Sequence, residues 1–411
     1  MFFVLIAVAL FSISPCFGWG WEDAKTQLEE QNPDLINQSK QVLMSYYSLS
    51  DSKSLFYPDV SLSAGFERFL QENATLGYRA FVGPRITWSV FEGGRRFYQK
   101  NLAESRLTEQ EAQQNAARLS QLKKLKEIFS SALFYKRYYF LSQELLKRTQ
   151  ENLRYVNLKY QSGSEYQWAY LSQKADVSKD ELRLEEIERD QTSILQELKL
   201  LLGELPIEHV KDIQENSFDI QPTISQSQIG SFDGSQHPTY TMFNSKVEQS
   251  EELLKISKSK SLPQLGFRTD FVAYRTDDNP FVPFWYAGVN FSMPIYSVGR
   301  NKRGKKSAML ALEQSLTKSA QTKEELVQSV EVGFQSYNIS KKRLEIARQE
   351  LEAIEQKNKV FREQYHAGLI GFIEWNRNET ELQNQKIAVL QRKKDVDFAY
   401  TSLEYSMGEI K

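Results

Sequence analysis

The chain repeats its turn-forming residues at a constant spacing of 205 positions. Tyr160 and Gly163 recur as Tyr365 and Gly368. Glycine and proline mark the ends of helices and strands, so agreement at such positions has structural meaning. Further residues with an identical counterpart 205 positions later are Pro58, Gly94, Arg95 and Gly203. Agreement at this many positions indicates a tandem duplication of one structural template.

The sequence pattern of each repeat predicts a short helix, a β-hairpin, a long helix and a return helix. Repeat 1 covers 19–203, with the hairpin at 58–91, the long helix at 95–160 and the return helix at 165–202. A linker at 204–236 separates the two copies. Repeat 2 covers 237–411, with the hairpin at 263–296, the long helix at 300–365 and the return helix at 370–408. The sequence therefore predicts an α+β protein with two tandem repeats.

The long helices exclude an ordinary compact domain. Residues 95–160 contain neither proline nor glycine, and a helix of this length would extend roughly 100 Å. The later half of the second long helix carries apolar residues seven positions apart, at Val330, Tyr337, Leu344 and Leu351. This spacing is typical of helices that supercoil against a neighbour. We therefore expect long antiparallel helical hairpins arranged as a coiled coil or as the staves of an α-barrel.

The hairpins alternate apolar and polar residues, as strands with one apolar face do. The first strand places Val60, Leu62 and Phe66 on its apolar side. Four strands are too few to close a membrane barrel, which needs about eight, and an open sheet edge is excluded from lipid. Other copies of the chain must therefore complete the sheet; three copies would supply twelve strands and two would supply eight.

The side chains around these strands fit a membrane barrel with a polar lumen. Aromatic residues in or near the strands, as in an interfacial girdle, are Tyr57, Phe69, Tyr78, Trp88, Phe91, Tyr274, Phe281, Trp285 and Tyr296. Polar residues predicted for the opposite face are Arg79, Arg85, Arg268, Asp270 and Asn290. The alternative interpretation places the same aromatic residues in the core of a soluble sandwich.

The N-terminus has the pattern of a secretory signal peptide. Residues 1–18 carry no charged side chain and contain an apolar run, which predicts cleavage after Gly18. Cys16 is the only cysteine, so a mature chain would lack disulfides. A lipoprotein with a modified Cys16 is the alternative, which Pro15 disfavours. No later apolar run is long enough for a transmembrane helix, and the net charge of −1 does not indicate a nucleic-acid partner.

The order of these elements resembles the TolC-like outer-membrane efflux protein family. The junctions Trp88-Ser89-Val90-Phe91-Glu92-Gly93-Gly94-Arg95 and Phe291-Ser292-Met293-Pro294-Ile295-Tyr296-Ser297-Val298-Gly299-Arg300 are similar to the family's strand-to-helix pattern. The resemblance implies a homotrimer in the outer membrane of a Gram-negative bacterium, with a shared twelve-stranded β-barrel and a periplasmic α-barrel. It further implies a passive duct that serves a periplasmic adaptor protein and an inner-membrane pump of RND, ABC or MFS type, as in tripartite efflux or type I secretion.

The resemblance also assigns roles to residues at the two helical tips. Tyr365 and Glu374 match gate positions of the family, and Arg377 stands where a second acid can occur. Glu374 and Arg377 are three positions apart on a helix and could form a local salt bridge. The adaptor would dock on Gly163 at the first tip and on Ala367-Gly368-Leu369 at the second. The first tip departs from the pattern because Ala169 replaces a carboxylate, and the second because Ile370 replaces a basic residue.

The sequence contains no constellation expected of an enzyme. The three histidines, His209, His237 and His366, are not spaced as metal ligands. Nucleotide-binding and nucleophile motifs are missing, and the carboxylates are spread along helix faces, where solvation is the usual role. We therefore expect no cofactor and no metal. The alternative to an exit duct is a periplasmic or surface coiled-coil structural protein without channel activity.

Overall fold

The computed structural model describes residues 19–70, 76–214, 226–276 and 279–410. The predicted signal peptide, 1–18, lies outside these residues. The helices are α1 (Trp21–Gln31), α2 (Pro33–Ser54), α3 (Arg95–Gln161), α4 (Gln167–Leu202), η1 (Val210–Asp212), α5 (Gln226–Gly230), α6 (Pro238–Ser259), α7 (Arg300–His366) and α8 (Phe372–Met407). The strands are β1 (Asp59–Leu70), β2 (Leu76–Phe91), β3 (Gln264–Thr276) and β4 (Asn279–Ser292). The long helices and the four-stranded sheet, to which each sequence repeat contributes two strands, confirm the predicted fold class.

The chain forms two compact units, and each draws on both sequence repeats. One unit contains 1–36, 118–232 and 328–411, and the other contains 37–117 and 233–327. The second unit therefore holds the whole sheet, α6, all of α2 after its first turn, and the first parts of α3 and α7. The first unit holds α1, α4, α8 and the remaining parts of α3 and α7. No helix among the described residues has both the length and the apolarity needed to cross a membrane.

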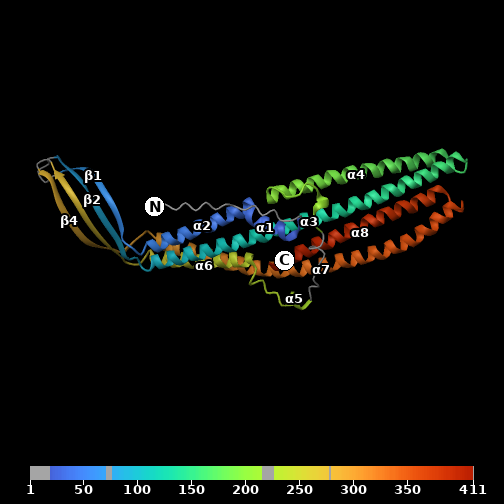
Figure 1. The fold of residues 1–411 in the computed structure, drawn as a ribbon. Coiled ribbons are helices and arrows are strands. Elements are labelled where there is room, and N and C mark those ends of the chain that lie inside the picture. Colours follow the sequence, from blue (N-terminus) through green and yellow to red (C-terminus); the bar gives the residue numbers. More distant parts are fainter. Residues whose placement is uncertain (1–18, 71–75, 215–225, 277–278, 411) are drawn as a thin grey trace, which may run out of the picture. The chain divides into compact units, whose positions relative to one another are not determined.

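The sheet is antiparallel, with its strands in the order β1-β2-β3-β4 (Figure 1). Val60 pairs with Ile86, Trp88 with Phe267, and Phe267 in turn with Val289. This register puts the alternating apolar residues of all four strands on one face, as the sequence predicted. β1 and β4 each have only one neighbour. The sheet is therefore open within one chain and requires strands from other copies to close.

The apolar face of the sheet is exposed. Side chains on it include Val60 at 68% exposure, Phe66 at 70% and Val289 at 69%. Trp285 is 64% exposed and stacks on Phe271. Of the aromatic girdle predicted from the sequence, the side chains of Phe69, Tyr78, Tyr274 and Phe281 lie outside those that the structure describes. A surface of this size and character fits contact with lipid better than contact with water.

The opposite face of the sheet carries four of the predicted polar residues, Arg85, Arg268, Asp270 and Asn290, and the side chain of Arg79 lies outside those that the structure describes. Asp270 accepts hydrogen bonds from Arg85 Nε at 2.7 Å and from Arg268 Nε at 2.8 Å. The Asp270 carboxylate of β3 thus joins β3 to Arg85 of β2 and also holds Arg268 of its own strand, and the three residues together keep a net positive charge. This charged cluster fits a water-filled lumen and not the core of a sandwich.

The heptad row of α7 packs against α8, as its spacing predicts. Val330 and Tyr337 are buried together with Val396, Tyr400 and Leu403 of α8. The Tyr337 and Tyr400 ring centroids are 5.5 Å apart. This packing joins the two helices of the second hairpin and brings the turn between them, 367–371, to the free end of that hairpin.

Candidate functional site at the helical tips

The two tips are built in the same way. Each long helix ends in a left-handed glycine, Gly163 with φ of 75° and Gly368 with φ of 74°. After the glycine, Ser164 N donates to Lys159 O and Leu369 N donates to Gln364 O, which closes the helix end with a Schellman motif. A Cβ at either glycine would meet no atom within 4 Å. The positive φ alone, and not crowding, therefore requires glycine there.

Tyr365 lies in the core of the tip. Its side chain is 1% exposed and packs with Val156, Ala169, Phe372 and Trp375. Its ring is stacked on Trp375, with the centroids 4.4 Å apart and the planes 7° from parallel. The residue predicted for the gate is thus anchored between α3, α4, α7 and α8 by apolar packing.

The hydroxyl group of Tyr365 reaches the first tip. It donates a hydrogen bond to Glu165 Oε2 at 2.9 Å. Burial, together with this bond to a carboxylate, raises the pKa of Tyr365 far above its ordinary value, so the phenol remains protonated and remains a donor. The contact joins the end of α7 to the turn that precedes α4.

Lys159 of α3 makes a second connection to the same tyrosine. Its Nζ donates to the carbonyl oxygen of Tyr365 at 2.6 Å and lies 4.0 Å from the centroid of the Tyr365 ring. A charge-assisted hydrogen bond and a cation–π contact therefore act together on one residue. We call Tyr365, Glu165 and Lys159 the tip clasp.

Sequence reasoning missed Glu165 and Lys159. Their counterparts in the second repeat are Ile370 and Gln364, so neither charge is duplicated. A charged residue at only one of two otherwise matching tips is a signal that could have identified them. The partners are about 200 positions from Tyr365 in sequence, which is why local spacing gives no indication of the contact.

His366 packs beside the clasp. Its ring stacks on Tyr155 of α3, with centroids 4.2 Å apart and planes 12° from parallel. Partial burial and the positive charges of Arg362 and Lys159 lower the pKa of His366. The neutral imidazole is therefore the form that favours the contact between α3 and α7.

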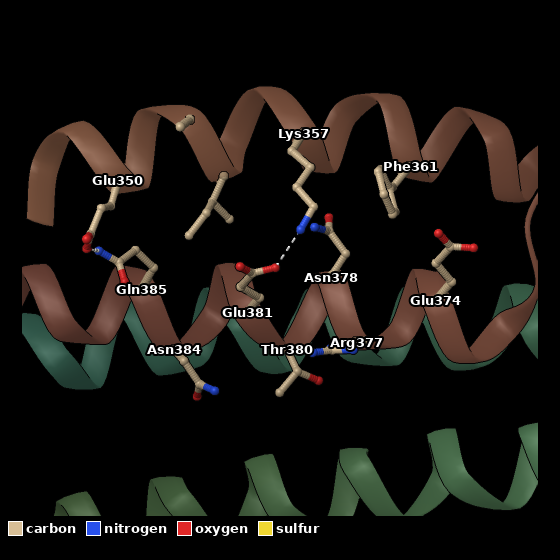
Figure 2. Close-up of a pocket in the computed structure, with 12 residues that line it drawn as sticks. Glu350, Lys357, Phe361, Glu374, Arg377, Asn378, Thr380, Glu381, Asn384 and Gln385 are labelled. Atoms are coloured by element: carbon tan, nitrogen blue, oxygen red, sulfur yellow. Dashed lines mark hydrogen bonds and ion pairs between the residues drawn. The ribbon is translucent and has the colours of Figure 1, made fainter.

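Glu374 and Arg377 line a groove of about 1010 Å³ between α7 and α8 (Figure 2). Glu374 extends into the space between the helices, and Arg377 lies on a different side of α8 (Figure 2). No ion pair joins the two in the part of the chain that the structure describes, so the predicted local salt bridge is not formed. Instead Lys357 of α7 donates to Glu381 of α8 across the groove at 2.8 Å.

A buried polar network lies next to this groove. Arg148 of α3 donates from Nε and Nη2 to the two carboxylate oxygens of Glu379 on α8, at 2.8 and 2.9 Å. Asn358 of α7 donates to Glu379 Oε1 at 3.0 Å and accepts from Arg148 at 2.6 Å. Burial alone would raise the pKa of Glu379, but the hydrogen bonds and charge of Arg148 outweigh it and hold the pKa below its usual range.

Further hydrogen bonds connect the hairpin of α3 and α4 to the hairpin of α7 and α8. Asn376 donates to Asp176 at 3.2 Å, and Gln383 donates to Thr149 at 3.0 Å. Thr149 itself donates to Asp180 of α4 at 2.6 Å. The two hairpins are thus held by polar bonds over several turns, with the tip clasp at their ends.

The adaptor-docking residues predicted from the sequence lie on the surface. Ala367 is exposed, and Leu369 is 74% exposed. Near them, Trp168 and Ile373 expose 48% and 70% of their side chains. The end of each hairpin thus presents apolar side chains to solvent, which suits a protein-binding surface.

Comparison with known proteins decides the family. The family model for outer membrane efflux proteins matches residues 25–204 and 236–409. The chain belongs to the outer membrane efflux protein family. The family places the protein in the outer membrane, extending into the periplasm, and its members are channels.

Solved structures show the same fold at low sequence identity. CusC is 15% identical, with a TM-score of 0.83 over 97% of this chain and 96% of that one. The CmeC outer membrane channel of Campylobacter jejuni is 16% identical, with a TM-score of 0.82 over 94% and 85%. The MtrE outer membrane channel of Neisseria gonorrhoeae is 14% identical, with a TM-score of 0.79 over 95% and 89%. No curated protein matches the chain in sequence.

Proposed function

We propose that the protein is the passive exit duct of a tripartite export system and works as a homotrimer. The observation that carries this proposal is the open sheet, which exposes an apolar face and presents a charged cluster on the other. Three copies would close it into a barrel of twelve strands, and the long hairpins would continue the duct as an α-barrel. The soluble coiled-coil alternative leaves the exposed apolar face unexplained.

In this proposal the helical tips act as a gate and as a docking surface for the adaptor. The tip clasp joins the ends of the two hairpins of one chain, so its release would free those ends to move apart. Glu374 lies in the groove between α7 and α8 and has no ion-pair partner among the described residues. Three such carboxylates around a pore would favour cations. Gly163, Ala367, Gly368 and Leu369 would receive the periplasmic adaptor, through which an inner-membrane pump of RND, ABC or MFS type delivers cargo.

A planar-bilayer recording tests the duct directly. The mature protein, purified in detergent, should migrate as a trimer and insert as discrete conducting units. Glu374→Gln should reduce cation preference, whereas Glu374→Asp, which keeps the negative charge, should retain it. A protein that remains monomeric and soluble without detergent, or that inserts no conducting unit, would refute the proposal.

A further inference from the structure

The start of α7 carries a dense group of positive charges. Five cations lie within its first two turns: Arg300, Lys302, Arg303, Lys305 and Lys306. All five residues are exposed, and none forms an ion pair with a carboxylate among the described residues. At roughly 100° per residue, the last four fall within an arc of roughly 160° of the helix surface. We call these five residues the basic collar.

The matching segment of repeat 1 gives its cations partners within the same repeat. Arg95 Nε lies 3.3 Å from Glu92, and Lys100 Nζ lies 2.7 Å from Glu104. Arg96 donates to main-chain oxygens, at Leu55 and Val90. Repeat 1 therefore uses Arg95 and Arg96 to hold its own junction together, and Lys100 is paired within α3.

Repeat 2 lacks the two acids that make those pairs. The positions that match Glu92 and Glu104 are Ser297 and Met309. No acidic residue occurs in the first turn of α7. The positive end of a helix dipole is unfavourable for cations, and like charges on adjacent turns repel one another. The segment itself therefore does not neutralise the collar, which leaves its charges available to an external anion.

Exposed apolar side chains immediately precede the collar. Met293 is 50% exposed, Ile295 95%, Tyr296 84% and Val298 70%. They follow β4, whose exposed face ends in Phe291, 66% exposed. The apolar surface of the sheet thus continues without a break to the first cations, as expected at the boundary between hydrocarbon and headgroups.

Val298 strengthens this interpretation because its backbone is strained. It has φ of 50°, in the left-handed region that β-branched residues avoid, and its counterpart in repeat 1 is Gly93, with φ of 63°. Repeat 2 therefore has a valine with a strained backbone at the position where repeat 1 has glycine. Burial of that side chain in the acyl region would compensate the strain.

We propose that the basic collar binds the headgroups of anionic phospholipids in the periplasmic leaflet of the outer membrane. Met293, Ile295, Tyr296 and Val298 anchor the adjoining segment among the acyl chains. Charge complementarity and continuity with the apolar face of the sheet identify a lipid surface as the occupant. This inference goes beyond the exit-duct proposal, because it depends on the outer-membrane location and not on pore, gate or adaptor.

Lipid binding to the full-length protein tests the collar. The detergent-purified protein is stripped of lipid and incubated with dioctanoyl phosphatidylglycerol or dioctanoyl phosphatidylcholine, and native mass spectrometry measures the bound lipid. The test variant is K302Q/R303Q/K305Q/K306Q. The matched control, K342Q/R343Q/R348Q/K359Q, removes four exposed cations from the same helix. A milder variant, K305Q/K306Q, serves if the fourfold change impairs folding.

The wild-type protein should prefer phosphatidylglycerol, and added salt should weaken that preference. The fourfold variant should lose at least about tenfold in affinity, since each cation near an anionic surface contributes on the order of fivefold. The control should keep wild-type affinity. Retained affinity in both collar variants would overturn the proposal, as would an equal loss in the control. Displacement by inorganic phosphate at the lipid's own concentration would show a free-anion site instead. A loss of oligomer with intact lipid preference would assign the collar to subunit contact.

Discussion

Removing the hydroxyl group of Tyr365 should loosen the closed state of the tip. Tyr365→Phe keeps the ring that stacks on Trp375 and the apolar packing around it, and removes only the donor to Glu165. The carbonyl bond from Lys159 is unaffected, because it involves the main chain. The perturbation therefore separates one polar bond from the rest of the clasp.

The expected magnitude follows from the character of that bond. A hydrogen bond to a charged group contributes about 1.5–3 kcal/mol. Glu165 is only half-buried, so water can replace part of the lost interaction, and we take the lower end, about 1.5 kcal/mol. This corresponds to about a tenfold shift from closed toward open for each protomer. Glu165→Gln retains an acceptor for the hydroxyl and should shift the equilibrium less.

Single-channel recording provides the assay, and uptake of a large antibiotic by cells gives an independent readout. Tyr160→Phe is the matched control. Tyr160 is the counterpart of Tyr365 in repeat 1, is 37% exposed and stacks on Tyr170. The open fraction should rise in Tyr365→Phe and stay at the wild-type level in Tyr160→Phe. Equal effects of the two changes, or none in Tyr365→Phe, would refute the role of the hydroxyl in closure.

Three further changes test other parts of the account. Because the pKa of Glu379 is depressed in the folded state, the ionised carboxylate stabilises the fold above the ordinary glutamate pKa of about 4.3, and this stabilisation is lost as pH falls through the pKa of the folded state. Melting curves of Glu379→Gln should lack this acid-dependent loss and show a lower melting temperature at neutral pH. Identical pH profiles of the variant and the wild type would contradict the network. Because the pKa of His366 is also depressed, its neutral form stabilises the tip above about pH 6.5, and this contribution is lost as pH falls below that value. Acidification should therefore raise the open fraction of the wild-type channel more than that of His366→Gln. Equal responses of the two proteins would show that His366 has no role in closure. Leu369→Asp should abolish co-purification of the adaptor from cells while conductance persists. The control Leu310→Asp, at an exposed leucine in the other unit of the chain, should leave co-purification of the adaptor unchanged. Unchanged adaptor binding by Leu369→Asp would place docking elsewhere.

The sequence predicts the fold because the fold is carried by local, repeated signals. Period-two alternation marks the strands, and the long segment without glycine or proline marks α3. The heptad row at Val330 and Tyr337 predicts packing on a neighbouring helix, and both residues are buried against α8. Such signals need only neighbouring residues in the chain, so one sequence is sufficient to read them.

The candidate site was predictable only in part. Its location followed from Gly163 and Gly368, which end the two long helices. The partners of Tyr365 did not follow, because Glu165 joins it across 200 positions of sequence. Nor did the pairing of Arg148 with Glu379, since neither residue stands out among the many charges on helix faces. Packing of four helices brings these groups together, and a single sequence does not encode which faces will meet.

The basic collar is a case in which the duplication itself carries information. Where the repeats agree, they report the shared fold. Where the repeats differ, the difference indicates a role that only one of the two repeats has. Ser297 stands where repeat 1 has Glu92, so the second junction lacks an acid that the first one has. The same reasoning applies at the tips, where Glu165 has no acidic counterpart.

The central claim is that other copies of the chain complete the sheet, and disulfide trapping between β1 and β4 tests it most directly. Within one chain these strands are separated by β2 and β3, so they lie roughly 14 Å apart, beyond the reach of about 7 Å between Cα atoms that a disulfide allows. In a Cys16→Ser background, Ser61 or Ser63 of β1 is changed to cysteine together with Asn290 or Ser292 of β4. We expect at least one of the four pairings to give a covalent trimer in outer-membrane fractions, dissolved by reductant. If every pairing leaves only monomers, and the detergent-purified protein is itself monomeric, the account is contradicted.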